Sequence, residues 1–268
     1  MKGADHKVYV WLRLATGFLL LAKAYQHFFF ELPYPALLKG SGTLILGAVL
    51  GLTGIGVLAS RHISSWLQKL LQLSTTILLG WALSNFIYKG FQLPQLMEHV
   101  LQVSLPLFYL WQHRESQEEN FFRRLSLAIG ITFLGHGLYA LGFPYPVPPH
   151  FVEMFMESLG GWGMTPELAR HCLSLAGILD IGVAIGLMIP ALRIYAAAYA
   201  CLWGFLTALA RLTSYVSFDA TFWESLHRYG FEFLTRSPHF LAPALIVYWY
   251  WRKNATKKQT ASQRISQA

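Results

Sequence analysis

Five ionisable side chains lie inside apolar stretches of the second half of the chain: His136, Asp180, Arg211, Glu232 and Arg236. A charge inside a lipid bilayer costs at least about 2.5 kcal/mol unless it is paired or hydrated, so such residues are the first candidates for a functional site. An α-helix rises about 1.5 Å per residue. Counted from the basic ends of their stretches, Asp180 is predicted near the middle of the membrane and Arg211 near its outer surface.

These residue types could handle protons and bind polar groups. His136 and Asp180 could accept or relay a proton, and Arg211 could hold a carboxylate or polarise a carbonyl. Because the arginine stem is long, a network of His136, Asp180, Arg211 and Glu232 is geometrically possible. Alternatively, Arg211 and an acid could simply hold helices together.

Three residues are candidates for binding: Glu232 and Arg236 of this set, and His239. Glu232 and Arg236 are one helical turn apart, where solvated ion pairs are common. Lys23, in the first apolar stretch, is expected to extend its amine towards the membrane surface. Neither pattern by itself requires a ligand.

The histidines raise the possibility of haem, since a bis-histidine haem needs two of them facing each other across helices. The histidines predicted in the outer half of the membrane are His27, His99, His136, His171 and His239. No spacing motif fixes such a pair. No H-x-x-x-H, H-x-x-E or paired-carboxylate spacing occurs on any apolar stretch, so no metal site is predicted.

The elements that must position these residues are membrane-spanning helices. The 268-residue chain is 54% hydrophobic and 13% charged, with a mean hydropathy of +0.41, whereas about a quarter of the residues of a soluble domain are charged. We predict an all-α, polytopic transmembrane bundle. Residues 92–112 are its weakest span, because Glu98, His99 and Pro106 interrupt them. The eight predicted spans cover residues 8–30, 40–59, 66–88, 92–112, 123–143, 167–189, 192–215 and 233–251.

The loops predict the orientation of the chain. One side holds an excess of basic residues, which favours the cytoplasm for both termini and suggests a bacterial inner membrane. The net charge of +8 is therefore explained by topology, and nucleic-acid binding is not needed. Anionic lipid headgroups are the expected neighbours of the basic tail at 253–268. The basic residues of this side are Lys2, Lys7, Arg61, Arg114, Arg123, Arg124, Arg193, Arg252, Lys253, Lys257, Lys258 and Arg264.

The chain also contains signs of an internal duplication. The tripeptide Pro-Tyr-Pro occurs at 33–35 and at 144–146, and each copy follows an Arg-Leu pair that lies twenty residues earlier. Later matches keep the same order at changing shifts: Gly47 and Gly56 correspond to Gly177 and Gly186, and His99 corresponds to His239. We therefore predict two parallel four-helix repeats, at 1–113 and 121–252.

The second repeat differs from the first in two ways. It has about nineteen extra residues, an insert at about 147–166 on the outer side, in which Phe151 and Met154 share a helical face opposite Glu153 and Glu157. This pattern predicts a short interfacial helix. In addition, the first-half positions that correspond to His136, Asp180 and Arg211 are Tyr25, Leu50 and Asn85, so the first half is expected to be electrically plainer.

Three sequences of the second half, "RRLSLAIGITFLGHGLYAL", "LAGILDIGVAIGLMI" and "YGFEFLTRSPHFLAPAL", resemble the DoxX/DoxD-like membrane family. The resemblance covers the second half and, more faintly, the first. It implies a quinone-interacting or accessory subunit of a membrane oxidoreductase system, with quinone as a possible cofactor. Two alternatives remain open: a proton-coupled transporter or channel with a site around Asp180, and a structural or assembly protein without a ligand.

Overall fold

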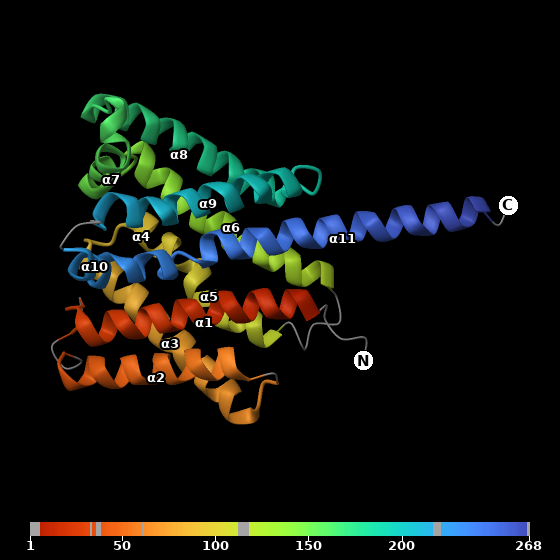
Figure 1. The fold of residues 1–268 in the computed structure, drawn as a ribbon, viewed down its shortest axis with the longest axis horizontal. Helices are drawn as coiled ribbons and strands as arrows, with labels where there is room; N and C mark the ends of the chain where they lie inside the picture. Colours follow the sequence, from red (N-terminus) through yellow and green to blue (C-terminus); the bar gives the residue numbers. More distant parts are fainter. Residues whose placement is uncertain are drawn as a thin grey trace.

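The computed structural model describes residues 6–32, 34–35, 39–60, 62–111, 118–216 and 221–266, which form helices and no strand (Figure 1). The predicted all-α class is therefore confirmed. Several predictions concern residues outside these ranges. They are part of the boundary between the repeats, at 114–117, and the positions of Lys2, Pro33, Arg61 and Arg114.

Within the described residues, six helices are long and apolar enough to cross a membrane. They match six of the eight predicted spans and indicate an integral membrane protein. Their lengths of 19 to 24 residues suit about 30 Å of hydrocarbon. The six are α1 (His6–Phe29), α2 (Ser41–Ala59), α3 (Ser65–Tyr88), α6 (Glu118–Leu141), α8 (Pro166–Met188) and α9 (Arg193–Tyr215).

The other two predicted spans are each broken into two helices. Residues 92–112 form α4 (Leu93–Glu98) and α5 (Val100–Trp111), with the break at His99. Residues 233–251 fall on the end of α10 (Phe222–Thr235), a helix that was not predicted, and on α11 (Pro238–Ser266). Pro238 begins α11 without a backbone N–H, which favours a break at this point. The basic segment predicted as a tail continues α11, which projects far beyond the bundle in Figure 1.

The predicted short helix in the second half is present as α7 (Pro149–Leu159), followed by a 3-10 turn, η2 (Gly160–Trp162). Phe151 and Met154 are buried, and Glu153 and Glu157 are exposed, as the pattern predicted. α7 packs against α8 and α9. It therefore covers one end of the bundle near the candidate site.

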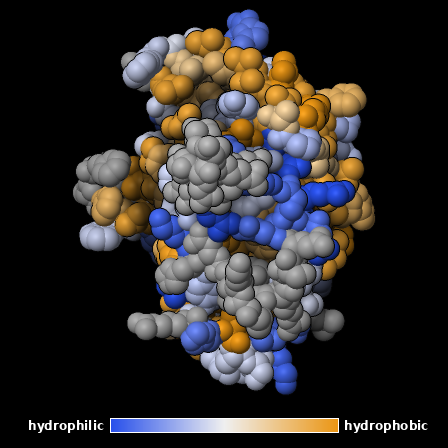
Figure 2. Space-filling model, turned by 90° about the vertical axis from the view of Figure 1, so that its right-hand side faces the viewer, coloured by the Kyte–Doolittle hydropathy of each residue, from blue (hydrophilic) through white to orange (hydrophobic). Residues whose placement is uncertain are grey.

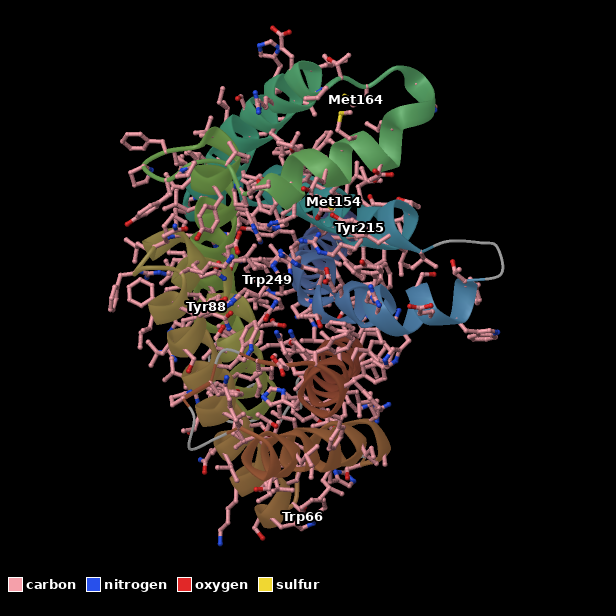
Figure 3. The ribbon with its side chains drawn as sticks, turned by 90° about the vertical axis from the view of Figure 1, so that its left-hand side faces the viewer. Trp66, Tyr88, Met154, Met164, Tyr215 and Trp249 are labelled. Atoms are coloured by element: carbon pink, nitrogen blue, oxygen red, sulfur yellow. The ribbon has the colours of Figure 1, made fainter. Side chains whose placement is uncertain are left out.

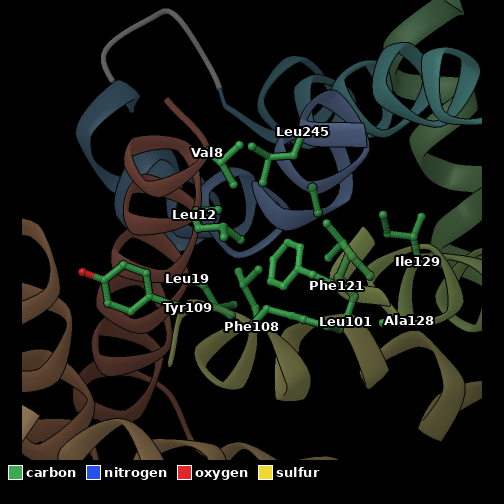
Figure 4. Packing of buried hydrophobic residues seen from close by; sticks show 14 of the residues in the cluster. Val8, Leu12, Leu19, Leu101, Phe108, Tyr109, Phe121, Ala128, Ile129 and Leu245 are labelled. Carbon is green, nitrogen blue, oxygen red and sulfur yellow. The ribbon is translucent and has the colours of Figure 1, made fainter. Parts of the chain in front are cut away.

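The core lies where α1, α5, α6 and α11 meet (Figure 4). Leu12 and Leu19 of α1, Leu101 of α5, Ile129 of α6 and Leu245 of α11 are at most 1% exposed. In contrast, α2, α3, α8 and α9 each present apolar side chains to the outside. Large exposed apolar faces of this kind are expected where a protein contacts lipid. Examples are Ile45, Leu52, Ile55, Leu79, Leu83, Leu175, Ile178, Ile185 and Leu202.

Polar residues gather instead at the end of the bundle from which α11 projects. Figure 2 shows hydrophilic residues across the middle of this end face and hydrophobic residues along its flanks. Arg252 pairs with Glu118 here, and the Lys253 amine lies 2.8 Å from a Glu119 carboxylate oxygen. The end face is thus polar and the sides are apolar, as a membrane environment requires.

Two glycines bring α6 and α8 into close contact. A Cβ atom at Gly177 would lie 2.8 Å from the carbonyl oxygen of Gly137, and a Cβ atom at Gly137 would lie 2.9 Å from that of Gly177. Only residues without a side chain allow this approach. It brings Asp180 on α8 towards His136 on α6.

Candidate functional site

The structure brings five of the six predicted site residues to the wall of one cavity. The cavity has a volume of about 60 Å³ and is bounded by α6, α7, α8, α9 and the start of α11. Its remaining wall is mostly apolar and aromatic, with Phe133, Phe151, Phe155, Leu173 and Trp203. We call it the aromatic cavity. The five predicted residues are His136, Asp180, Arg211, Arg236 and His239.

His136 is held between a carboxylate and a guanidinium. Its Nδ1 lies 2.7 Å from Oε1 of Glu98, and its Nε2 lies 2.9 Å from Nη1 of Arg236. Because an arginine can only donate, Nε2 must accept, and the ring proton is assigned to Nδ1, which faces the Glu98 carboxylate. The geometry therefore favours a neutral His136 with a defined tautomer. Gly135 allows this arrangement, because a Cβ atom there would lie 3.0 Å from the backbone nitrogen of Glu98.

Arg211 pairs with Glu232, the sixth predicted residue. Its Nε lies 3.3 Å from Glu232 Oε2, and its Nη1 donates to the carbonyl oxygen of Thr207 at 2.9 Å. Arg211 is 7% exposed, so its side chain is buried within the bundle. Of the possible network, the structure therefore contains the pair of Arg211 and Glu232, whereas Arg236, expected beside Glu232, donates to His136.

Asp180 and His239 have buried polar atoms without partners. Asp180 is 4% exposed and His239 is 3% exposed. Trp203 is a hydrogen-bond partner of the Asp180 side chain, and the backbone of Arg236 is one of the His239 ring. Within the described residues, Asp180 Oδ1 and at least one ring nitrogen of His239 have none. Buried polar groups are nearly always satisfied, so each unsatisfied group at a cavity is a candidate for ligand contact. The His239 ring lies 5.3 Å from the His136 ring, between centroids.

Sequence reasoning missed several residues that the first half contributes. Lys23 does not extend to the surface: it is 1% exposed, and its amine lies 3.3 Å from the centre of the Trp81 ring. His99 stacks on the same Trp81 ring, with 4.5 Å between the two ring centres. The first half, expected to be electrically plainer, therefore also contributes buried ionisable side chains. The rule applied to the second half, that buried ionisable residues mark sites, would have found Lys23, Glu98 and His99.

A second, larger cavity of about 210 Å³ lies between the two halves. We call it the basic cavity, because Lys23, Arg211 and Arg236 all line it. It shares Met154, Arg211 and Arg236 with the aromatic cavity. Figure 3 shows the end of the bundle where α7 and α10 lie. Met154 of α7 and Tyr215 of α9 are close together there, and both line the basic cavity.

The geometry does not fit a bis-histidine haem at His136 and His239. Both nitrogens of His136 are engaged, by Glu98 and by Arg236, so neither is free to bind iron. Within the described residues, no group of three His, Cys, Asp or Glu side chains could hold a metal ion.

Comparisons with protein-family models, with curated proteins and with solved structures give no match to this chain. The site must therefore be interpreted from its own geometry.

Proposed function

We propose that this chain is a DoxX/DoxD-like integral membrane protein that binds a quinone and acts as a quinone-interacting or accessory subunit of a membrane oxidoreductase system. The observation that carries the proposal is the aromatic cavity. There, His239 and Asp180 present buried polar atoms without partners to an apolar and aromatic wall.

Quinone chemistry suits this combination of groups. A quinone has a flat apolar ring with two carbonyl acceptors, and small-molecule sites typically combine an apolar wall with a few convergent polar groups. His239 and Arg211 can donate to a carbonyl oxygen, and the Asp180 carboxyl can hold a proton. The cavity of about 60 Å³ suits the carbonyl edge of the ring. Reduction of a quinone takes up two protons and two electrons; in this proposal Asp180 and His239 handle the protons, and partner subunits supply the electrons.

Helix packing supports the two-repeat arrangement that belongs to this proposal. α1 packs on α2 as α6 packs on α8, and α3 packs on α5 as α9 packs on α11. Between the halves, α1 contacts α10 and α11, and α6 contacts α4 and α5 in the same way. In this proposal, α4 with α5 and α10 with α11 form the fourth span of each repeat. The protein would then cross a bacterial inner membrane eight times, with both termini in the cytoplasm.

Binding of decylubiquinone to the purified protein in detergent tests the proposal. We expect Asp180→Asn and His239→Leu each to weaken binding about 10-fold to 100-fold, because a lost hydrogen bond in a buried site costs about 1.5 to 3 kcal/mol. Isothermal titration calorimetry gives the affinity, and solvent extraction of the protein from membranes shows whether a native quinone copurifies.

His171→Leu is the matched control, because His171 lies on α8 with an exposed side chain and does not line the aromatic cavity. It should bind decylubiquinone like the wild type. No binding by the wild type, or equal losses in His171→Leu and His239→Leu, would contradict the proposal.

One observation favours a second candidate, a proton-coupled transporter. Asp180 is buried in the middle of α8 with one oxygen atom unpartnered, as expected of an intramembrane coupling group. Proton flux into liposomes that disappears in Asp180→Asn would support transport and exclude the quinone-subunit proposal as stated. If Asp180→Asn changes only the folding yield, the residue is structural.

A further inference from the structure

We propose that the basic cavity binds an oxyanion, a phosphate or carboxylate group, with Lys23 as its main charged contact. This inference concerns a different cavity from the quinone proposal and does not depend on it. It rests on the charge balance of the cavity, on its unpartnered polar atoms and on its opening to the surface.

The first step is the charge balance. Of the described residues that line the basic cavity, three are cations, Lys23, Arg211 and Arg236, and one is a carboxylate, Glu232. Glu232 is engaged by Arg211, and the neighbouring Glu98 is engaged by His136. With neutral imidazoles, three cations therefore face two carboxylates. At the cavity mouth, loss of contact with water and then the nearby Arg211 guanidinium lower the pKa of His150 to about 4, so this ring adds no charge at pH 7.

In its protonated form, Lys23 carries the uncompensated charge. Its amine lies 3.2 Å from the side-chain oxygen of Gln26 and 3.3 Å from the centre of the Trp81 ring. Both partners are neutral. An ammonium that is 1% exposed and lacks a carboxylate partner is costly, because burial removes its hydration without replacing it by an opposite charge. A bound anion would supply the missing charge.

The second observation is a set of buried polar atoms that have no partner within the described residues. Trp81 Nε1, His99 Nδ1 and Gln102 Oε1 are all unpartnered, on side chains that are 4% to 8% exposed. All three residues line the basic cavity. Gln102 Oε1 can only accept, whereas the indole N–H can only donate and His99 can donate from one of its nitrogens. Together with Lys23 and the two arginines, the wall offers many donors, and such a wall suits an acceptor-rich ligand.

The third observation is access. The cavity of about 210 Å³ has room for a ligand group larger than a water molecule. The Glu232 side chain at its wall is 40% exposed, so the cavity reaches the surface at the end of the bundle where α7 and α10 lie. The oxyanion could therefore be a small solute or the phosphate of a lipid headgroup.

Thermal unfolding separates these two sources. In detergent, inorganic phosphate is titrated against chloride at constant ionic strength; in a second arm, nanodiscs of phosphatidylglycerol are compared with nanodiscs of phosphatidylcholine. We expect one arm to raise the Tm of the wild type. Protection by phosphate identifies a free oxyanion, and protection by phosphatidylglycerol alone identifies an anionic lipid headgroup.

Lys23→Met and Lys89→Met form a matched pair, since each removes one positive charge and Lys89 is exposed at the end of α3. Lys23→Met should weaken the protection at least tenfold in apparent affinity and, without oxyanion, should raise the Tm because an unpaired buried charge is removed. Lys89→Met should respond like the wild type. Lys23→Gln serves the same purpose should Lys23→Met not accumulate.

The inference is overturned if neither arm protects the wild type, or if Lys23→Met and Lys89→Met respond alike. The two proposals fail separately. Asp180→Asn, in the aromatic cavity, should lose decylubiquinone and keep the oxyanion effect, whereas Lys23→Met should lose the oxyanion effect and keep decylubiquinone.

Discussion

At the scale of single residues, His136 connects the two halves of the chain. Glu98 from the first half and Arg236 from the second hold its two nitrogens at 2.7 and 2.9 Å. A single imidazole thus bridges opposite charges that lie 138 positions apart in the sequence. Its orientation and tautomer are fixed by these partners, whereas the His239 ring, 5.3 Å away, keeps at least one nitrogen without a partner within the described residues. We infer that Glu98 and Arg236 position His136, while His239 remains available to a ligand.

Glu98→Gln should therefore destabilise the protein. The amide removes the negative charge that faces Nδ1–H of His136. The same charge offsets the guanidinium of Arg236. Hydrogen bonds to charged groups are worth about 1.5 to 3 kcal/mol. We expect a clear drop in the Tm of the detergent-solubilised protein.

Glu157→Gln provides the comparison, because Glu157 is exposed on α7 and loses the same charge. Its free energy of unfolding should change by no more than about 0.5 kcal/mol, as for an ordinary surface substitution. Its Tm should therefore stay close to that of the wild type. Equal effects of the two substitutions would show that the contact between Glu98 and His136 contributes nothing to stability.

At the scale of secondary-structure elements, close helix contacts at glycines set the distances within the site. α6 and α8 approach each other through Gly137 and Gly177, and α9 approaches the start of α11 at Gly204, where a Cβ atom would clash with the backbone of His239. These contacts bring Asp180 and His239 together in the wall of the aromatic cavity. Gly47, Gly51 and Gly54 on α2 likewise form a packing surface, because α1 atoms lie 3.0 to 3.4 Å from the positions of the missing Cβ atoms.

Two glycines of α8 give a matched test of this packing. Gly177→Ala should destabilise the protein by about 1 to 3 kcal/mol through overpacking against Gly137 and Leu141. In Gly182→Ala nothing lies within 4 Å of the new Cβ atom. That substitution should be neutral or stabilise the helix by about 0.5 to 1 kcal/mol. Thermal unfolding of both variants measures the difference, and the reverse order would contradict the packing described.

At the scale of the whole molecule, the chain is a bundle with apolar sides and a polar end from which α11 projects. α1 begins and α11 leaves the bundle at the same end, and α7 and α10 lie at the other (Figure 1). The reciprocal contacts between the halves place the basic cavity between them and the aromatic cavity inside the second half. A ligand in the basic cavity would therefore contact both halves, whereas a ligand in the aromatic cavity would contact mainly one.

The membrane orientation can be tested with single cysteines. After Cys172 and Cys201 are replaced by serine, Lys89→Cys and Glu157→Cys should react with a membrane-impermeant maleimide from the periplasmic side of intact cells. Asn254→Cys on α11 should react only in inverted vesicles, because the basic end is expected in the cytoplasm. Labelling of Asn254→Cys and Lys89→Cys from the same side would contradict a bundle in which these positions lie at opposite ends.

Four features could be predicted from the sequence alone: the class of the protein, six of its long helices, the short helix α7 and most of the polar side chains of the aromatic cavity. These features depend on local composition and helical periodicity, which can be summed along the chain without knowing its neighbours. Asp180, for example, is conspicuous because an acid in an apolar helix is costly wherever that helix packs.

The interaction partners of the buried polar side chains, in contrast, depend on the tertiary structure. Whether Arg236 binds Glu232 or His136, and whether Lys23 reaches the surface or is buried against Trp81, depends on how each helix is rotated and how deeply it sits in the bundle. Contacts between residues about a hundred positions apart set this rotation and depth, and so do the breaks at His99 and before Pro238. The basic cavity arises entirely from this packing, because its lining residues come from both halves of the chain.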